Sequence, residues 1–148
     1  SKEFYLSNRL SKLSGYDYVL MDCAPTINLI NQNALLFAEE LMVPVSMDYL
    51  SLVGVKQLLQ NIKVLNKLFN KSLRIKMVIP TFYDKRNKKT RFIMDSLERA
   101  FPNCISSPIR VSVAFSEAPS VKKTIWEHDH MYSKGVKDYK KLVEEVCG

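Results

Sequence analysis

The sequence is poor in glycine, in cysteine and in long apolar runs, and each shortage excludes a class of protein. Only four glycines occur among 148 residues, and none precedes a Lys-Ser or Lys-Thr pair, so a G-x-x-x-x-G-K-[ST] phosphate-binding loop is missing. The three cysteines are far apart and lack metal-ligand spacing, which favours reduced thiols in a cytoplasm. No apolar stretch approaches the roughly 20 residues of a membrane helix, and the first residues carry no signal-peptide core. We expect a cytoplasmic protein with no membrane partner.

The composition is that of an ordinary globular protein. Hydrophobic residues make up 47% of the chain and charged residues 25%. A chain of this length is expected to form one domain, residues 1–148, with a real hydrophobic core. The net charge of +7 suggests a polyanionic partner, although a solubilising surface would explain it equally well.

Apolar spacing predicts an alternation of strands and helices. Because the predicted helices have about ten or more residues, this order is typical of an α/β fold with a parallel sheet and helices on both faces. A polar loop is expected around His128–His130, before the last helix. The predicted strands are 18–21, 41–45, 75–82 and 103–106, and the predicted helices are 4–13, 28–38, 52–69, 92–101 and a C-terminal helix from about residue 133.

The most informative segment is the apolar run that ends in Asp22. A buried strand here would deliver one carboxylate at its carboxyl end, where ligands gather in open parallel sheets. A carboxylate at that point is well placed to hold a water on Mg²⁺ near nucleotide phosphates. The alternative is a strand terminator whose side chain caps the following turn.

Three stretches together resemble the C-terminal half of a ParA-type partition ATPase, of the deviant Walker family that includes MinD. Their order and spacing match across almost the whole chain. The segment Thr81-Phe82-Tyr83-Asp84 also resembles the family's chain after the strand that reaches the adenine. The three stretches are 17–25 with Asn33-Ala34-Leu35, 43–49 with 52–59, and Ser116-Glu117-Ala118-Pro119-Ser120 with Lys134-Gly135 and Tyr139.

The resemblance implies a P-loop NTPase-like site for ATP and Mg²⁺ in the complete protein. Asp22 matches the Walker B aspartate, which would hold Mg²⁺ through a water, and Pro25 belongs to the matching switch segment. Asp48 matches an acidic position that reaches the partner's nucleotide in the ATP-bound dimer. Thr81 and Phe82 fall where the family builds its adenine pocket, although packing at a strand end would account for them as well.

The resemblance also shows what this sequence lacks. The first predicted strand matches one well inside the family's chain, so the N-terminal strands and the Walker A loop are missing. Without that loop the chain alone should not hydrolyse ATP, no catalytic residue is assigned to it, and whether it binds nucleotide stays open. A truncated ATPase and a separately encoded half-protein both remain open. A remnant of a complete ATPase should expose apolar surface where the missing strands would pair, and should self-associate.

A basic cluster follows the third predicted strand. In the family that this sequence resembles, ATP-bound dimers bind DNA without sequence preference. Arg86 corresponds to a position that the family commonly uses for DNA, and counterion release would favour such a strip. A solvated helix face is the alternative. A second patch of the family is weakened here, because Ala114 stands where an arginine is usual. The residues predicted to contact double-stranded DNA are Lys85, Arg86, Lys88, Lys89, Arg91 and Arg110.

These observations predict a part of an ATP-dependent, DNA-binding partition protein that acts in plasmid or chromosome segregation. The resemblance implies a dimer at the nucleoid and a ParB-like protein that stimulates hydrolysis. The main alternative is a non-catalytic module that has lost nucleotide binding and works by dimerisation or by binding partners. A MinD-like regulator is disfavoured by the segment Ser116-Glu117-Ala118-Pro119 and by the lack of an amphipathic tail.

Overall fold

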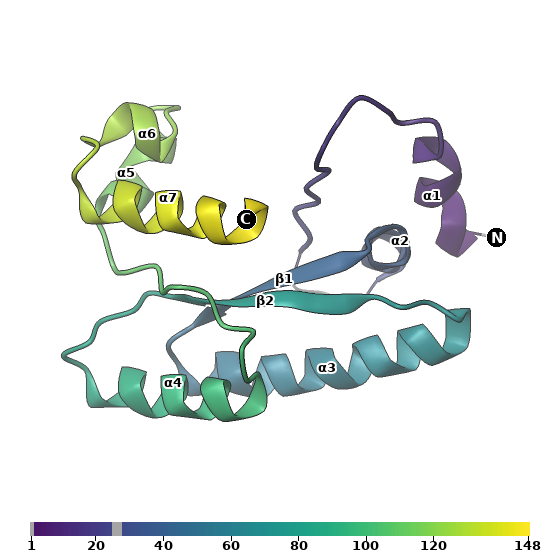
Figure 1. Ribbon diagram of the computed structural model, residues 1–148, viewed down its shortest axis with the longest axis horizontal. Helices are drawn as coiled ribbons and strands as arrows, with labels where there is room; N and C mark the ends of the chain where they lie inside the picture. The colour runs from purple at the N-terminus through teal and green to yellow at the C-terminus, as the bar shows by residue number, and fades with distance from the viewer. Residues whose placement is uncertain (1, 25–27) are drawn as a thin grey trace. The chain divides into compact units, whose positions relative to one another are not determined.

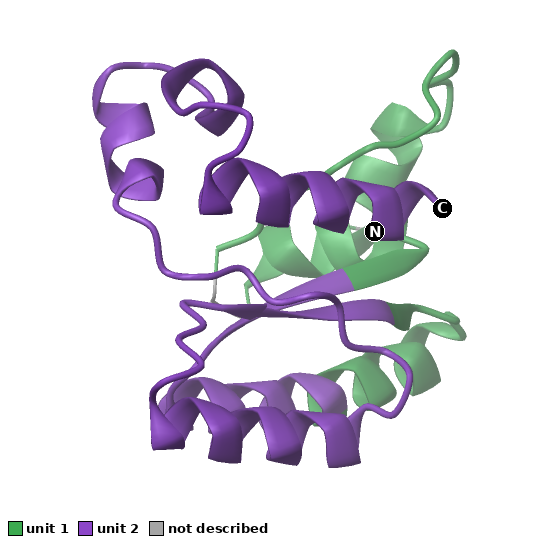
Figure 2. Ribbon diagram, turned by 60° about the vertical axis from the view of Figure 1, so that its left-hand side comes forward, with its two compact units in different colours: residues 1–41, 60–75 green, residues 42–59, 76–148 purple. Residues whose placement is uncertain are grey.

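A computed structural model describes residues 2–24 and 28–148 of the chain. The chain folds into two compact units (Figure 2). The smaller unit comprises residues 1–41 and 60–75, and the larger unit comprises residues 42–59 and 76–148. No helix in the described ranges is both long enough and apolar enough to cross a bilayer.

The sheet is built on two parallel strands, β1 (Glu40–Ser46) and β2 (Arg74–Thr81) (Figure 1). The Arg74 N–H donates to the Glu39 carbonyl near the start of both strands, and the Met47 N–H donates to the Thr81 carbonyl at their ends. The strands therefore run in the same direction. The 21-residue helix α3 (Tyr49–Phe69) provides the crossover that a parallel pair requires. The strands predicted at 41–45 and 75–82 are confirmed.

A third extended segment lies along the other side of β2. Val78 pairs with Ile105 and Tyr83 pairs with Arg110, both in parallel orientation. The predicted strand at 103–106 is thus in the right place, but it consists of isolated bridges. Pro108 lies between the two bridges and has no N–H to donate, which explains why the pairing is interrupted.

Helices cover both faces of the sheet in the larger unit (Figures 1 and 2). Helix α4 (Lys88–Ala100) lies on the same face as α3, and helix α7 (Lys134–Cys147) lies on the opposite face. The spacing of Ile93 and Leu97 predicts a buried stripe on α4, and both side chains are almost completely buried. The predicted α/β fold, with a parallel sheet between two layers of helices, is confirmed.

Polar side chains set where three helices begin. Asn28 accepts the Asn31 N–H at 2.9 Å at the start of helix α2 (Leu29–Phe37). Asn87 does the same for the Lys89 N–H at the start of α4, and Ser133 for α7. Each cap satisfies a backbone donor that the first turn leaves unpaired. These caps explain why the predicted helices at 28–38 and from 133 agree with the structure.

Two short helices, α5 (Ala114–Ser120) and α6 (Ile125–His128), precede α7. The loop predicted around His128–His130 is wrong for its first residue, because α6 includes His128. The helix begins where the Glu127 carboxylate accepts both the backbone N–H and the hydroxyl of Thr124, each at 2.8 Å. This cap stabilises a single turn that has no apolar periodicity to reveal it.

The smaller unit contains the 3₁₀ turn η1 (Lys2–Phe4) and helices α1 (Tyr5–Leu10) and α2. The strand predicted at 18–21 is wrong. Residues 18–24 form neither helix nor strand, and Leu20 is 75% exposed. An apolar run becomes a strand only when another strand pairs with it, and the sheet of the described residues consists of β1 and β2.

Candidate functional site

The carboxyl ends of β1 and β2 meet at one edge of the sheet. The hydrogen bond from the Met47 N–H to the Thr81 carbonyl, 3.2 Å long, joins the two ends directly. Asp48 follows one strand and Phe82 follows the other. The structure therefore brings together three residues that the sequence predicts for a nucleotide site, at the edge where open α/β sheets bind ligands.

Asp48 is a half-buried carboxylate that caps helix α3. Its oxygens accept the Ser51 N–H at 2.8 Å and the Ser51 hydroxyl at 2.9 Å. These two hydrogen bonds lower the pKa of Asp48 below its ordinary value, and the charge of Lys89 contributes in the same direction. The side chain is therefore ionised at neutral pH and adds a negative charge to this edge.

Phe82 adopts an unusual backbone conformation at the end of β2. Its φ is +52°, in the left-handed region that bulky side chains rarely occupy, and the residue is 68% exposed. Strained residues of this kind occur most often where a site requires them. The conformation leaves a flat aromatic surface accessible beside Thr81.

Asp22 is exposed in the irregular segment of the smaller unit. The carbonyl of Ala24, two residues later, accepts a hydrogen bond from the Asn31 side-chain amide at 2.6 Å, which attaches this segment to α2. Pro25 lies outside the described residues. The roles of Asp22 and Pro25 at a nucleotide site remain predictions.

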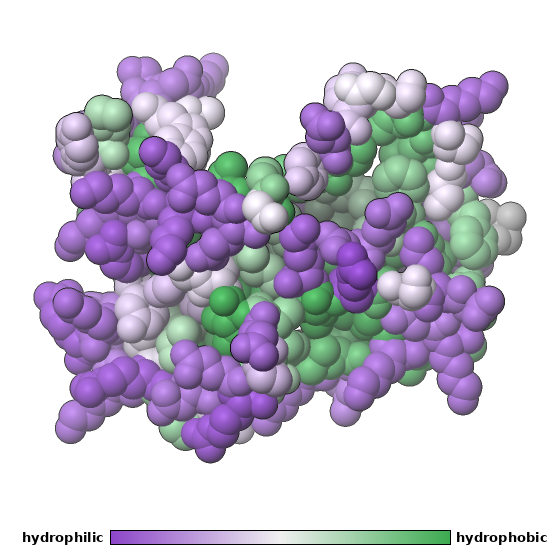
Figure 3. Space-filling view, viewed as in Figure 1, coloured by the Kyte–Doolittle hydropathy of each residue, from purple (hydrophilic) through white to green (hydrophobic). Residues whose placement is uncertain are grey.

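The basic cluster occupies the turn after β2 and the first turn of α4. All five of its cationic side chains are exposed, and Figure 3 shows a hydrophilic surface where α4 begins. Backbone N–H groups at a helix start also favour anions. The basic cluster consists of Lys85, Arg86, Lys88, Lys89 and Arg91.

One acid lies directly before the basic cluster. Asp84 accepts the Nε–H of Arg86 at 3.0 Å on Oδ1 and an Nη2–H at 2.8 Å on Oδ2. This pairing lowers the pKa of Asp84 to about 2 and raises the pKa of Arg86. Asp84 was not among the site residues predicted from the sequence, although its position two residues before Arg86 is a local signal.

Arg110, the sixth predicted DNA contact, is engaged by another acid. Its guanidinium donates to both carboxylate oxygens of Asp138, and the Nη2–Oδ1 distance is 2.6 Å. The pair raises the pKa of Arg110. The Arg110 side chain is 41% exposed and its partner carboxylate 10%, whereas the Arg86 side chain is 85% exposed, so the basic cluster is the stronger candidate for binding phosphates.

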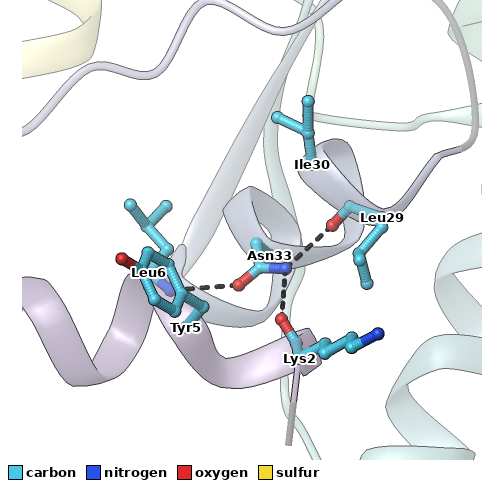
Figure 4. A pocket seen from close by; sticks show the side chains of 6 residues that line it. All are labelled: Lys2, Tyr5, Leu6, Leu29, Ile30 and Asn33. Atoms are coloured by element: carbon cyan, nitrogen blue, oxygen red, sulfur yellow. Dashed lines mark hydrogen bonds between the residues drawn. The ribbon is translucent and has the colours of Figure 1, made fainter.

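The smaller unit contains a hollow of about 380 Å³ that the sequence did not predict (Figure 4). The buried Asn33 side chain accepts the Leu6 N–H at 3.0 Å and donates to the carbonyls of Lys2 and Leu29. The Asn33 amide is thus hydrogen-bonded to backbone groups. The rest of the lining is mainly apolar. The lining residues are Lys2, Tyr5, Leu6, Leu29, Ile30 and Asn33.

Two solved structures share this fold. Apo McdA from Cyanothece superposes with a TM-score of 0.83 at 21% identity, and the match covers 98% of this chain and 59% of McdA. Cobyrinic acid a,c-diamide synthase from Mycobacterium smegmatis, with bound ADP and magnesium, gives a TM-score of 0.76 at 24% identity over 99% of this chain and 53% of the synthase. The fold of this chain is therefore the one that these two α/β proteins share.

Sequence relatives then identify the family. The family model described as an AAA domain matches residues 1–75. The sporulation initiation inhibitor protein Soj of Bacillus subtilis is 32% identical, with 99% of this chain and 58% of Soj covered. The chromosome-partitioning ATPase Soj of Treponema pallidum is 31% identical, with 98% of this chain and 58% of that protein covered. The chain belongs to the family that this AAA-domain model describes, and it matches ParA-type partition proteins over nearly its whole length. It corresponds to their C-terminal portion and spans less than two thirds of these relatives' length.

Proposed function

We propose that this chain is the C-terminal part of an ATP-dependent, DNA-binding partition protein that acts in chromosome or plasmid segregation. The proposal is supported by the residues that lie together at the carboxyl ends of β1 and β2 in the larger unit. Asp48, Thr81 and Phe82 are gathered there, and the basic cluster begins three residues after Phe82. A nucleotide-binding edge next to an exposed cationic strip would connect ATP binding to DNA binding.

ATP and Mg²⁺ are the ligands that these residues suit. The exposed Asp22 carboxylate could hold a water on Mg²⁺, which usually keeps several waters and takes only one or two protein carboxylates. Thr81 and the exposed Phe82 ring would contact the adenine, and Asp48 would lie toward the nucleotide of a partner subunit.

The printed sequence carries no Walker A motif, so hydrolysis would need a phosphate-binding loop from elsewhere. We infer that the complete assembly dimerises on ATP, binds duplex DNA at the nucleoid without sequence preference, and is stimulated by a ParB-like partner. The partition relatives support this role. We expect the isolated chain to turn over no ATP.

The experiment that tests DNA binding exchanges charge inside and outside the basic cluster. The Lys88→Glu, Lys89→Glu double variant should bind random duplex DNA more weakly in a fluorescence-anisotropy titration. Its plot of log affinity against log salt should lose about 1.8 units of slope, because each phosphate contact contributes about 0.9. Lys140→Glu with Lys141→Glu is the matched control, since both lysines are exposed on α7 and the charge change is identical. Equal loss in both variants would refute a specific role for the basic cluster.

A non-catalytic interaction module is the second candidate function. The smaller unit exposes large apolar side chains, Tyr18, Leu20 and Ile30 among them, which is the kind of surface that partners cover. Calorimetry with ATP and Mg²⁺ distinguishes the two functions. Heat of binding favours the nucleotide-dependent function. Self-association in light scattering at micromolar concentration, without ATP binding, favours the module.

A further inference from the structure

Asp84 and Arg86 form an ionic contact at the start of the basic cluster. Three donors of Arg86 converge on one carboxylate: the backbone N–H and Nε–H on Oδ1, both at 3.0 Å, and an Nη2–H on Oδ2 at 2.8 Å. The Arg86 side chain is nevertheless 85% exposed. Its guanidinium is therefore held on one edge by protein and is open to solvent on the other.

The edge of the Arg86 guanidinium that Asp84 occupies is one that could bind a phosphate. A guanidinium binds a phosphate best through two parallel N–H donors, and the Nε and Nη2 pair is one such fork. In this structure the fork is filled by Asp84, which the low pKa of about 2 keeps ionised at neutral pH. A phosphate would have to use the other edge of Arg86 or displace the carboxylate.

We propose that Asp84 is a built-in competitor of DNA, which occupies the Arg86 fork and lowers the affinity of the basic cluster for phosphate. This inference rests on the proposed DNA binding and adds a residue that regulates it. Lys134, at the start of α7, also acts on the charge of Asp84. Removing the negative charge of Asp84 should free the Arg86 fork for phosphate.

The variant Asp84→Asn tests the proposal with little disturbance of the turn. An asparagine keeps the oxygen that accepts the Arg86 backbone N–H, and asparagine suits this type of turn as well as aspartate does. We expect affinity for random duplex DNA to rise about threefold, in line with the modest strength of exposed ion pairs. The log–log salt slope should steepen by up to about 0.9, the value of one added phosphate contact.

A matched control separates this local effect from net charge. Arg74 donates Nε–H and Nη2–H groups to Glu40 at 3.1 and 2.6 Å, so Glu40→Gln removes one negative charge from a comparable exposed pair in the smaller unit. We expect this variant to leave DNA affinity unchanged. In the Arg86→Gln background, the change Asp84→Asn should give less than half of its effect on the wild type.

The outcomes are distinguishable. Unchanged or weaker binding by Asp84→Asn, with wild-type binding that still depends on Lys88 and Lys89, overturns the role of Asp84 and leaves the proposed function intact. An equal gain in the Arg86→Gln background, or in Glu40→Gln, also overturns it, because the effect would then be general electrostatics. If the wild-type chain binds no duplex DNA at low salt, both the proposed DNA binding and this inference fail.

Discussion

Arg110 donates both its backbone N–H and its guanidinium to the carboxylate of Asp138. The N–Oδ2 distance is 2.9 Å and the Nη2–Oδ1 distance is 2.6 Å. Two turns further along α7, Glu145 accepts the N–H and hydroxyl of Ser107. Pro108, which lies between Ser107 and Arg110 in the third extended segment, has no N–H. The α7 carboxylates thus accept two N–H groups of the third extended segment, and Pro108 offers none. Together these features protect that side of the sheet from pairing with another chain.

Asp138→Asn should destabilise the larger unit. The Asp138 side chain is 10% exposed and that of Arg110 is 41% exposed, so the loss should be about 2 kcal/mol, below the cost of breaking a fully buried pair. Urea denaturation followed by circular dichroism measures the change. Glu144→Gln, at an exposed position of the same helix, should change the free energy of unfolding by less than about 0.5 kcal/mol. Equal effects would show that the Arg110 contact contributes nothing.

Alanine at Gly54 and at Gly135 should have different effects. A Cβ at Gly54, in the exposed part of α3, meets nothing within 4 Å, so Gly54→Ala should stabilise by about 0.5–1 kcal/mol through helix propensity. A Cβ at Gly135 would lie 3.0 Å from Cε1 of Phe115, and overpacking of this kind costs about 1–3 kcal/mol. Thermal denaturation should rank Gly54→Ala above wild type and Gly135→Ala at or below it.

The Phe115 contact is testable by itself. Adding Phe115→Leu to Gly135→Ala removes the ring atoms that the new Cβ meets, and this should recover stability relative to Phe115→Leu alone. A penalty of the same size in both backgrounds would place the strain of Gly135→Ala elsewhere.

Asn33→Ala should loosen the attachment of η1 and α1 to α2. The side chain connects the Leu6 N–H with the carbonyls of Lys2 and Leu29, and its loss leaves partly buried backbone groups unpaired, at a cost of about 1–3 kcal/mol. Hydrogen exchange of the Leu6 amide should become faster. Gln32→Ala, the preceding residue of α2, should leave that exchange rate unchanged.

The Asp84 carboxyl should titrate well below an ordinary aspartate. Its pKa is about 2 in the folded chain against an ordinary value of 3.8, chiefly because of the Arg86 side chain. Since the folded pKa is the lower one, the stabilisation by this pair is complete above about pH 4 and is lost as the pH falls toward 2. Carbon-detected NMR of the carboxyl group measures the midpoint. In Arg86→Gln the midpoint should rise, and an unchanged midpoint would contradict the assigned cause.

Much of the fold could be predicted because its signals are local. The stripe that includes Ile93 and Leu97 shows the inward face of α4 directly in its spacing, and Asn28 and Ser133 mark helix starts. The predictions that were wrong concern features that depend on residues far apart in the chain. The apolar run around Leu20 looks like a buried strand, yet whether it forms one depends on a pairing partner that local sequence does not reveal.

The candidate site shows the same division. Asp48, Thr81 and Phe82 were each assigned to a nucleotide site through the family resemblance, and the larger unit brings these residues to one edge of the sheet. The partner of Arg110 could not be predicted. Asp138 lies 28 residues later on a helix whose polar positions carry no periodic signal for a partner.

The sequence by itself determined the α/β class, the helix faces and starts, the position of the basic cluster and the lack of a Walker A motif, because these depend on residues close together in the chain. Only the tertiary structure decided which cations are already paired, Arg86 with Asp84 and Arg110 with Asp138, and which apolar run stays outside the sheet. Those outcomes depend on the distances between side chains and on which strands are available to pair. Packing of the whole chain sets both.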